Sequence, residues 1–413
     1  MTKTTLISIK KHLLEICIFL CLILPPIGVL LLLIIGSYHL HQTWKNSEGM
    51  MLTPGLFLLA CMFFSSFCAS IVLGNLSYFL VPALIIAYAG IYKKIQKDGV
   101  ERTFAAYKWI TIFAGVYFYC LYPFQEILIS PTYKNYITGT ALVGQAGFHD
   151  YQRLIGAAYN PNFSVTLLLL GLSFLLAECL KNIRKECYSR AAFQGVITLI
   201  FIHAVFLTGS RAGFSAMVVI FLLFLFRLNR ILTFSLMIII GLNINLILDW
   251  MPRNENLLQS AIRRKEIWKN SIQLWQENAL FGLTPLGFGK EYILHFNEHI
   301  PHAHNLILGI FTEYGTLGGT AFLIVLFINV YKGIYLYFTK QNVRQLDTLL
   351  LSLPVILLTG IFDYVLFSPQ IALIGIILIA YWDKYTAGLP IWSSWMLSIP
   401  RWSDRLFYKK RDW

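Results

Sequence analysis

The chain has 413 residues, of which 57% are hydrophobic and only 13% are charged. Soluble domains carry charge on roughly 25% of their residues, so this composition excludes an ordinary soluble protein and favours a chain folded in lipid. The net charge of +13 does not indicate a nucleic-acid partner, because the basic residues form short clusters between apolar runs, as in the cytoplasmic loops of membrane proteins.

Long apolar runs predict an all-α fold, a polytopic bundle of transmembrane helices that forms a single domain over residues 1–413. A helix needs ~20 apolar residues to cross a bilayer core of roughly 30 Å, and continuously apolar runs favour helices over barrel strands. The predicted spans are 13–36, 55–73, 77–92, 109–124, 162–180, 191–207, 212–228, 231–249, 305–330, 346–364 and 370–386.

The first apolar run follows Lys10 and Lys11 and is interrupted by Pro25 and Pro26. No small-residue cleavage site follows it, so we predict a retained helix rather than a signal peptide. Two topologies fit the run. The bundle has either eleven spans with the N-terminus outside, or twelve spans with both ends inside and a first run bent into a hairpin by proline. The second is favoured.

Lysine and arginine gather in alternate connections along the chain: 93–108, 181–190, around residue 229, 332–344 and the C-terminal tail. Cytoplasmic loops are enriched in these residues, so this pattern places the connections between them on the outer face. The predicted outer segments are the loop 125–161, the turn 208–212 and the long loop 250–303. Within the long loop, residues 262–280 carry Trp268, Ile272 and Trp275 on one stripe, which is typical of a short interfacial helix.

The outer segments carry arginines that suit an anion. Arg211 lies between two apolar helices, where a charge costs ~2.5–3.5 kcal/mol unless it has a partner; the alternative is an arginine that snorkels to lipid headgroups. Together with Arg153 and Arg264 it would bind phosphate, because the planar guanidinium matches phosphate oxygens in pairs. Arg263 and Arg264 also fit an ordinary solvated charge run.

Four histidines crowd the stretch before the span at 305: His295, His299, His302 and His304. His304, next to Asn305, is the predicted general base, because a neutral imidazole near pH 7 can accept a proton from an attacking hydroxyl. His302 is the second choice. A structural histidine and a metal site are the alternatives. Glu313 lies two to three turns into the span and is predicted to be paired or neutral, most simply as a counter-ion to an arginine.

Four short motifs follow one another on the outer face: Arg153-x-x-Gly156 before Asn160-Pro161-Asn162, then Ser210-Arg211-Ala212-Gly213, then Arg264-x-x-x-Trp268 before Gly287-x-Gly289, and His304-Asn305 before Glu313, Gly315 and Gly318. In this order and spacing, over roughly residues 150–330, the chain resembles the bacterial O-antigen ligase and O-antigen polymerase family. Ala212 departs from the family pattern, because it is inserted before the glycine of a Ser-Arg-Gly turn.

The resemblance implies a glycosyltransferase of lipopolysaccharide or polysaccharide biosynthesis, in the bacterial inner (cytoplasmic) membrane with its site toward the periplasm or cell exterior. The implied donor is a glycan on undecaprenyl diphosphate, and the acceptor is a sugar hydroxyl on a lipid A core or on another lipid-linked glycan. Membrane lipids surround it and no nucleic acid takes part. The implied transfer inverts the sugar and needs no metal or other cofactor. The implied catalytic residues are His304, Arg211 and Arg264, and the implied substrate-binding residues are Arg153, Asn162, Ser210, Arg263, His302, Asn305 and Glu313.

These residues leave the acceptor open, so ligase, polymerase and transfer to a protein are alternatives. A membrane transporter of a small solute is the alternative from another class. Transporters usually hold their substrate near the bilayer midplane on broken helices, whereas this constellation lies at the outer boundary.

Overall fold

A computed structural model describes residues 12–46, 52–99, 101–129, 132–142, 152–253, 257–338 and 345–387. Within these ranges the regular secondary structure is entirely helical, which confirms the predicted all-α bundle. Eight of the described helices are long and apolar enough to cross a membrane, and three shorter apolar helices accompany them.

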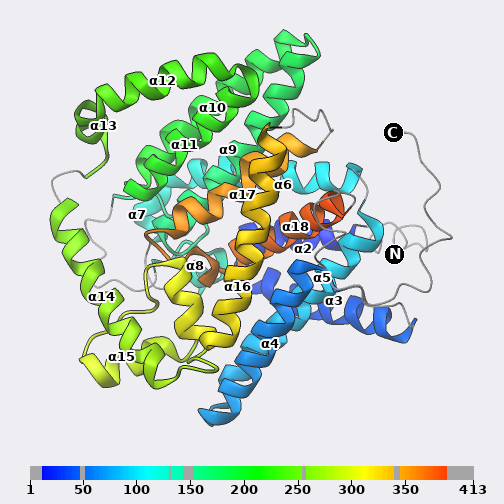
Figure 1. The fold of residues 1–413 in the computed structure, drawn as a ribbon, viewed down its shortest axis with the longest axis vertical. Coiled ribbons are helices and arrows are strands. Elements are labelled where there is room, and N and C mark those ends of the chain that lie inside the picture. The colour runs from blue at the N-terminus through cyan, green and yellow to red at the C-terminus, as the bar shows by residue number, and fades with distance from the viewer. Residues whose placement is uncertain are drawn as a thin grey trace.

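The bundle helices follow the predicted spans in order: α2 (Leu13–Ile23), α3 (Pro25–Lys45), α4 (Pro54–Val72), α5 (Leu80–Asp98), α6 (Glu101–Leu121), α9 (Pro161–Arg184), α10 (Tyr188–Leu207), α11 (Arg211–Leu228), α12 (Arg230–Leu242), α16 (Leu306–Phe338), α17 (Leu346–Gly360) and α18 (Pro369–Thr386). The shorter helices are η1 (Leu76–Phe79), η2 (Tyr122–Phe124), α7 (Gln125–Leu128), α8 (Tyr133–Thr138), α13 (Ile244–Trp250), α14 (Leu257–Glu277), α15 (Phe288–Phe296) and η4 (Val365–Phe367). We call the end of the bundle that carries α14 and α15 the loop end (Figure 1).

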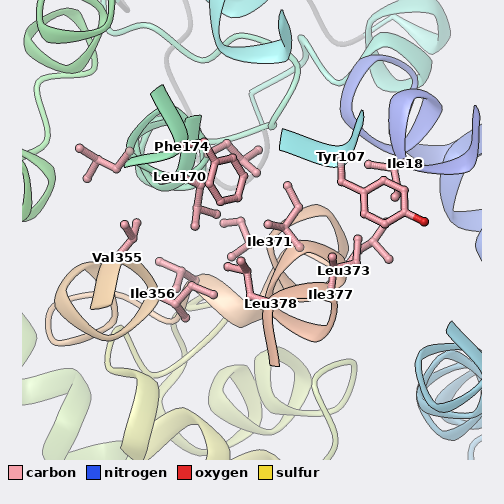
Figure 2. Close-up of a cluster of buried hydrophobic side chains, with 14 of the residues drawn as sticks. Ile18, Tyr107, Leu170, Phe174, Val355, Ile356, Ile371, Leu373, Ile377 and Leu378 are labelled. Carbon is pink, nitrogen blue, oxygen red and sulfur yellow. The ribbon is translucent and has the colours of Figure 1, made fainter. Parts of the chain in front are cut away.

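Helix α9 is the central helix of the bundle. It is buried along most of its length and packs against α6, α10, α11 and α17. Figure 2 shows Leu170 and Phe174 of α9 facing side chains of α17 and α18, among them Val355 and Ile371. The segments that flank α9 are therefore anchored to one rigid, close-packed helix, which fixes the positions of their polar groups.

The first apolar run consists of two helices. α2 ends at Ile23 and α3 begins at Pro25, with Leu24 between them in a non-helical conformation. α3 then bends back so closely that a Cβ on Gly28 would lie 2.1 Å from the backbone nitrogen of Cys21. The break agrees with the twelve-span topology, and α3 extends to Lys45 rather than ending near residue 36.

Some sequence predictions fall on residues outside the described ranges. These are the cations at 340 and 344, the basic C-terminal tail, and positions 130–131 and 143–151 of the outer loop 125–161. The long loop 250–303 is described except for residues 254–256. It contains two helices, α14 and α15, as the sequence predicts for this loop.

The tryptophan stripe of α14 packs against protein. Trp268 Nε1 donates to the carbonyl oxygen of His304 at 3.3 Å, and Trp275 Nε1 donates to Thr316 Oγ1 at 3.3 Å. The Trp275 ring also lies 5.1 Å from the ring of Phe311. These contacts, rather than the bilayer surface alone, fix α14 against the start of α16.

Helix α16 is interrupted near the loop end. Gly315 has φ 61° and ψ −169°, which is not a helical conformation and is essentially restricted to glycine. The segment 279–284 fills the break, where the carbonyls of Thr312 and Glu313 accept backbone hydrogen bonds from it and Thr316 N–H donates back at 2.7 Å. The backbone groups freed by the break are thus satisfied by the long loop.

An apolar cavity of about 640 Å³ lies between α3, α4, α5, α16, α17 and α18. Its lining begins at Pro285, Leu306 and Tyr364 near the loop end and continues to Tyr337 and Trp382, toward the far ends of α16 and α18. The cavity therefore extends along the helices from a starting point next to Asn305 and Asp363.

Candidate functional site

Segments far apart in the sequence meet at the loop end, at a narrow pocket between α9, α11, α14 and the turn after α17. Its lining residues are Asn162, Val165, Ser210, Ala212, Arg264, Thr359, Phe362, Asp363 and Val365. The structure thus brings together the first three of the four motifs. The fourth reaches the same place through Asp363, as shown below.

Arg153 joins the first motif to the second. Its Nε donates to the carbonyl oxygen of Thr208 at 2.6 Å, and its Nη2 donates to Asn162 Oδ1 at 3.1 Å. Asn162 is held in turn by Asn160, which caps the start of α9 and accepts a hydrogen bond from the Asn162 backbone. The Asn-Pro-Asn sequence therefore begins a helix and presents an amide to an arginine.

The 208–213 turn puts Arg211 at the first position of α11. Gly209 takes the left-handed conformation with φ 59°, and Ser210 caps the helix by accepting from Gly213 N–H at 3.2 Å. Arg211 Nη1 donates to the carbonyl oxygen of Arg253 at 3.0 Å. The Ser210 hydroxyl is thus engaged as a cap, and Arg211 is fixed to the beginning of the long loop.

Arg264 projects from α14 into the pocket. Its Nη1 donates to Ser260 Oγ at 3.2 Å, and its guanidinium carbon lies 5.8 Å from the centre of the Phe362 ring. Burial lowers the pKa of Arg264, Asp363 raises it and Arg253 lowers it. Arginine nevertheless stays protonated in proteins, so the result is a desolvated cation that an anionic ligand would stabilise.

His304 and Asp363 form a hydrogen-bonded pair at the pocket. His304 Nδ1 lies 3.0 Å from Asp363 Oδ1, and the same oxygen accepts the backbone N–H of Tyr364 at 2.8 Å. His304 has φ 48°, in the left-handed region that is uncommon for a residue with a side chain. The Trp268 contact to its carbonyl holds this backbone in place.

His302 lies beside this pair but is oriented differently. Its Nδ1 accepts a hydrogen bond from the His304 backbone at 3.4 Å and lies 3.6 Å from Asp363 Oδ1. The His302 side chain is only 3% exposed, whereas that of His304 is 25% exposed. His304 is therefore accessible to a substrate, whereas the buried His302 holds the His304 backbone by a hydrogen bond.

Burial and neighbouring charge set the protonation of the two buried groups. Burial, with the positive charge of His304, lowers the pKa of His302 to about 3, against a smaller opposite effect of Asp363. Burial would raise the pKa of Asp363, but the two histidines and the Tyr364 N–H together lower it below its ordinary value. A charged carboxylate thus faces His304, next to a neutral His302.

The same three residues also satisfy the geometry of a metal site. One ligand atom each from His302, His304 and Asp363 lies within 4.8 Å of the others. Three ligands with a fourth position open are typical of catalytic zinc. A metal that used Nδ1 of either histidine would replace the hydrogen bond that this atom now makes.

Three predicted substrate-binding residues are placed elsewhere or are engaged in the fold. Arg263 pairs with Glu266 and Glu298 at the surface of α14. Asn305 caps α16, accepting from Leu308 N–H at 2.9 Å and donating to Ile361 O at 2.8 Å. Glu313 is fully buried beside Tyr364 and, among the described residues, makes no ion pair with an arginine; the predicted counter-ion role has no support there.

Residues 196–323 match the family model described as O-antigen ligase. The match supports the O-antigen ligase family for this part of the chain. It runs from α10 into α16 and includes Arg211, Arg264 and His304, whereas Arg153 and Asp363 lie outside the matched range. A comparison with curated proteins finds no match.

Two charged residues near the site, Asp363 and Arg253, carry little signal in the sequence. Asp363 is an acid at the end of a predicted span, and the signal for it was a charge where only apolar residues are expected. Arg253 lies within the matched range, directly after the apolar helix α13, and nothing in its neighbourhood of the sequence distinguishes it from an interfacial cation.

Proposed function

We propose that the chain transfers a glycan from a polyprenyl diphosphate, such as undecaprenyl diphosphate, to the hydroxyl of an acceptor sugar. The observation that carries the proposal is the His304–Asp363 pair beside three arginines at one end of a membrane bundle. The O-antigen ligase family match supports glycan transfer as the reaction class. The proposal treats residues 1–413 as one membrane domain with 125–161 and 250–303 as its outer loops.

His304 would act as the general base. Its Nδ1 hydrogen donates to Asp363, which leaves Nε2 with a lone pair. Nε2 would take the acceptor hydroxyl proton as the hydroxyl oxygen attacks the anomeric carbon. Asp363 would hold the ring in this tautomer and stabilise the imidazolium that forms.

The arginines would stabilise the leaving group. As the new bond forms, the bond from the anomeric carbon to the diphosphate oxygen breaks, and its electron pair goes to the diphosphate. Arg264 lines the pocket, Arg153 donates to Asn162 of its lining, and Arg211 follows Ser210 of its lining in the chain. Fixed cations at such a place favour charge that develops in the transition state. Attack opposite the leaving group would invert the sugar.

The apolar cavity supports a lipid-linked donor. It starts at Leu306 and Tyr364, which directly follow Asn305 and Asp363 in the chain. Its volume of about 640 Å³ falls within the roughly 300–1,000 Å³ of typical ligand sites. A hydrocarbon chain in this cavity would bring its diphosphate to the arginines at the loop end.

We propose the bacterial inner membrane as the location, with the loop end outside, because the described cations of the connections 181–190 and around residue 229 lie at the opposite ends of α9 and α11. The acceptor would be a lipid A core or another lipid-linked glycan, corresponding to ligase or polymerase action.

The test is complementation of a strain that lacks the gene. Arg211→Ala, Arg264→Ala and His304→Ala, at expression equal to the parent, are expected to abolish long surface glycan while lipid-linked glycan accumulates. Lys265→Ala, an exposed cation next to Arg264 on α14, is the matched control and is expected to behave as the parent. Full activity in all three variants would reject the mechanism, and transport of a solute without glycan transfer would favour a transporter.

Two additions separate the remaining alternatives. Single repeat units still attached in the deletion strain would assign polymerase rather than ligase action. In a purified assay, activity that survives a metal chelator is expected from a histidine base, whereas loss that added zinc restores would assign a metal to His302, His304 and Asp363.

A further inference from the structure

Arg253 lies near the start of the long loop, three residues after the end of α13, and its backbone contacts Arg211. It has φ 59°, a left-handed conformation that is uncommon for a residue with a side chain. Its carbonyl oxygen accepts the hydrogen bond from Arg211 Nη1. The strained backbone at this position therefore has a role, which is to fix Arg211.

The side chain of Arg253 lies along the same glycine as Arg153. A Cβ on Gly209 would be 3.2 Å from Arg153 Nε and 3.4 Å from Arg253 Cδ, so the glycine leaves room for both side chains. Arg253 also acts electrostatically on Arg264. Arg253 thus lies close to Arg153, bonds to Arg211 through its carbonyl and acts on the charge of Arg264.

The guanidinium of Arg253 differs from those of the other three arginines in its partners. Arg153, Arg211 and Arg264 each donate a hydrogen bond to a protein oxygen. Arg253 is exposed and, over the ranges that the structure describes, its guanidinium has no hydrogen bond or ion pair. This exposed guanidinium offers five N–H donors.

We infer that Arg253 is a substrate-binding residue that clamps the diphosphate of the donor from its solvent side. The inference rests on the proposed function. Arg153, Arg211 and Arg264 would hold the diphosphate from the protein side, and Arg253 would offer a second pair of donors to the phosphate that stays exposed.

The test measures binding of inorganic diphosphate to the purified chain in detergent. Arg253→Gly removes the guanidinium, keeps the carbonyl that holds Arg211, and suits the left-handed backbone. Arg253→Asn, which also tolerates this conformation, is the second variant. We expect both to raise the dissociation constant roughly tenfold or more, with melting temperatures at or above that of the parent. Lys265→Gln is the control and is expected to bind as the parent.

The outcomes are distinguishable. Variants that bind diphosphate as tightly as the parent would overturn the role of Arg253 and leave the proposed function standing. A parent chain that does not bind diphosphate at all would overturn the proposed anion site itself. Weakening by Arg253→Gly together with a retained melting temperature would support the clamp, because loss of fold is then excluded.

Discussion

The two histidines at the site differ in the atom that each presents to its neighbours. His302 Nδ1 accepts the His304 backbone N–H, so it has no proton to give to Asp363. His304 Nδ1 is then the donor in the 3.0 Å contact with Asp363. His302 is thus occupied by a backbone hydrogen bond, whereas the Nε2 atom of His304 keeps a lone pair that can accept a proton.

Asp363→Asn tests this assignment. An asparagine amide facing Nδ1 would favour the tautomer with hydrogen on Nε2, which cannot accept the acceptor proton. We expect kcat to fall roughly 10²–10⁴-fold with little change in KM, as for the loss of an orienting acid. Transfer to a defined acceptor, measured at several pH values, provides the readout.

The pH profile gives this prediction a second check. The folded pKa of Asp363 is depressed, so its carboxylate is charged above its ordinary pKa and is neutralised only when the pH falls below that range. Protonation of Asp363 therefore cannot lower the parent rate at neutral or mildly acidic pH. An acidic limb that is the same in Asp363→Asn, with an unchanged kcat, would remove Asp363 from the mechanism.

At the scale of elements, the break in α16 connects this helix to the long loop. Gly315 lets the backbone of α16 turn out of the helix so that residues 279–284 can bond to it. The same loop continues into α15 and then into the turn that ends at His304. The position of His304, the proposed base, thus depends on a helix interruption eleven residues further along the chain.

Gly315→Ala is expected to destabilise the protein strongly. Its φ of 61° excludes an ordinary side chain, and the new Cβ would lie 2.3 Å from the backbone oxygen of Leu280. We expect a loss of roughly 2 kcal/mol or more in unfolding free energy, seen as a lower melting temperature in detergent. Gly333→Ala in the same helix is the control, because nothing lies within 4 Å of its Cβ position; equal losses in both variants would contradict the role of the break.

The helices were predictable from the sequence because each is a continuous apolar run, and the bend at Pro25 and Pro26 was predictable because proline cannot continue a helix. The site was only partly predictable. Motif order indicated His304 and the arginines, but the partner of His304 lies 59 residues later, and no periodicity reports such a long-range contact. Arg263 stays a prediction for the site: it is one helical residue from Arg264, and its side chain pairs with Glu298.

At the scale of the whole molecule, charge is held at both ends of an apolar bundle. Away from the loop end, Asp347 accepts hydrogen bonds from Arg184 and Arg227, which ties α17 to α9 and α11. At the loop end the arginines outnumber the acid that faces them. Both arginines at the first end are paired with a carboxylate of the protein, whereas the arginines at the loop end are suited to an anionic ligand.

The cavity between these two ends leads to a prediction about the donor chain. A lipid chain gains little hydrophobic free energy by moving from a bilayer into a protein cavity, since both are apolar; its affinity would come from close packing. Filling the cavity should therefore raise KM and leave kcat nearly unchanged. Gly333 lines the cavity with open space at its Cβ position, so Gly333→Phe is the variant chosen to place a ring in it.

We expect Gly333→Phe to raise KM for a long-chain donor roughly tenfold, about 1.4 kcal/mol, and to affect a short-chain donor less. Gly241→Phe is the matched control, because Gly241 on α12 has equally open surroundings and does not line the cavity. An unchanged KM in Gly333→Phe, with an unchanged melting temperature, would place the chain in the surrounding bilayer. The diphosphate would then be recruited by the arginines alone, since the protein would offer the rest of the lipid no binding surface of its own.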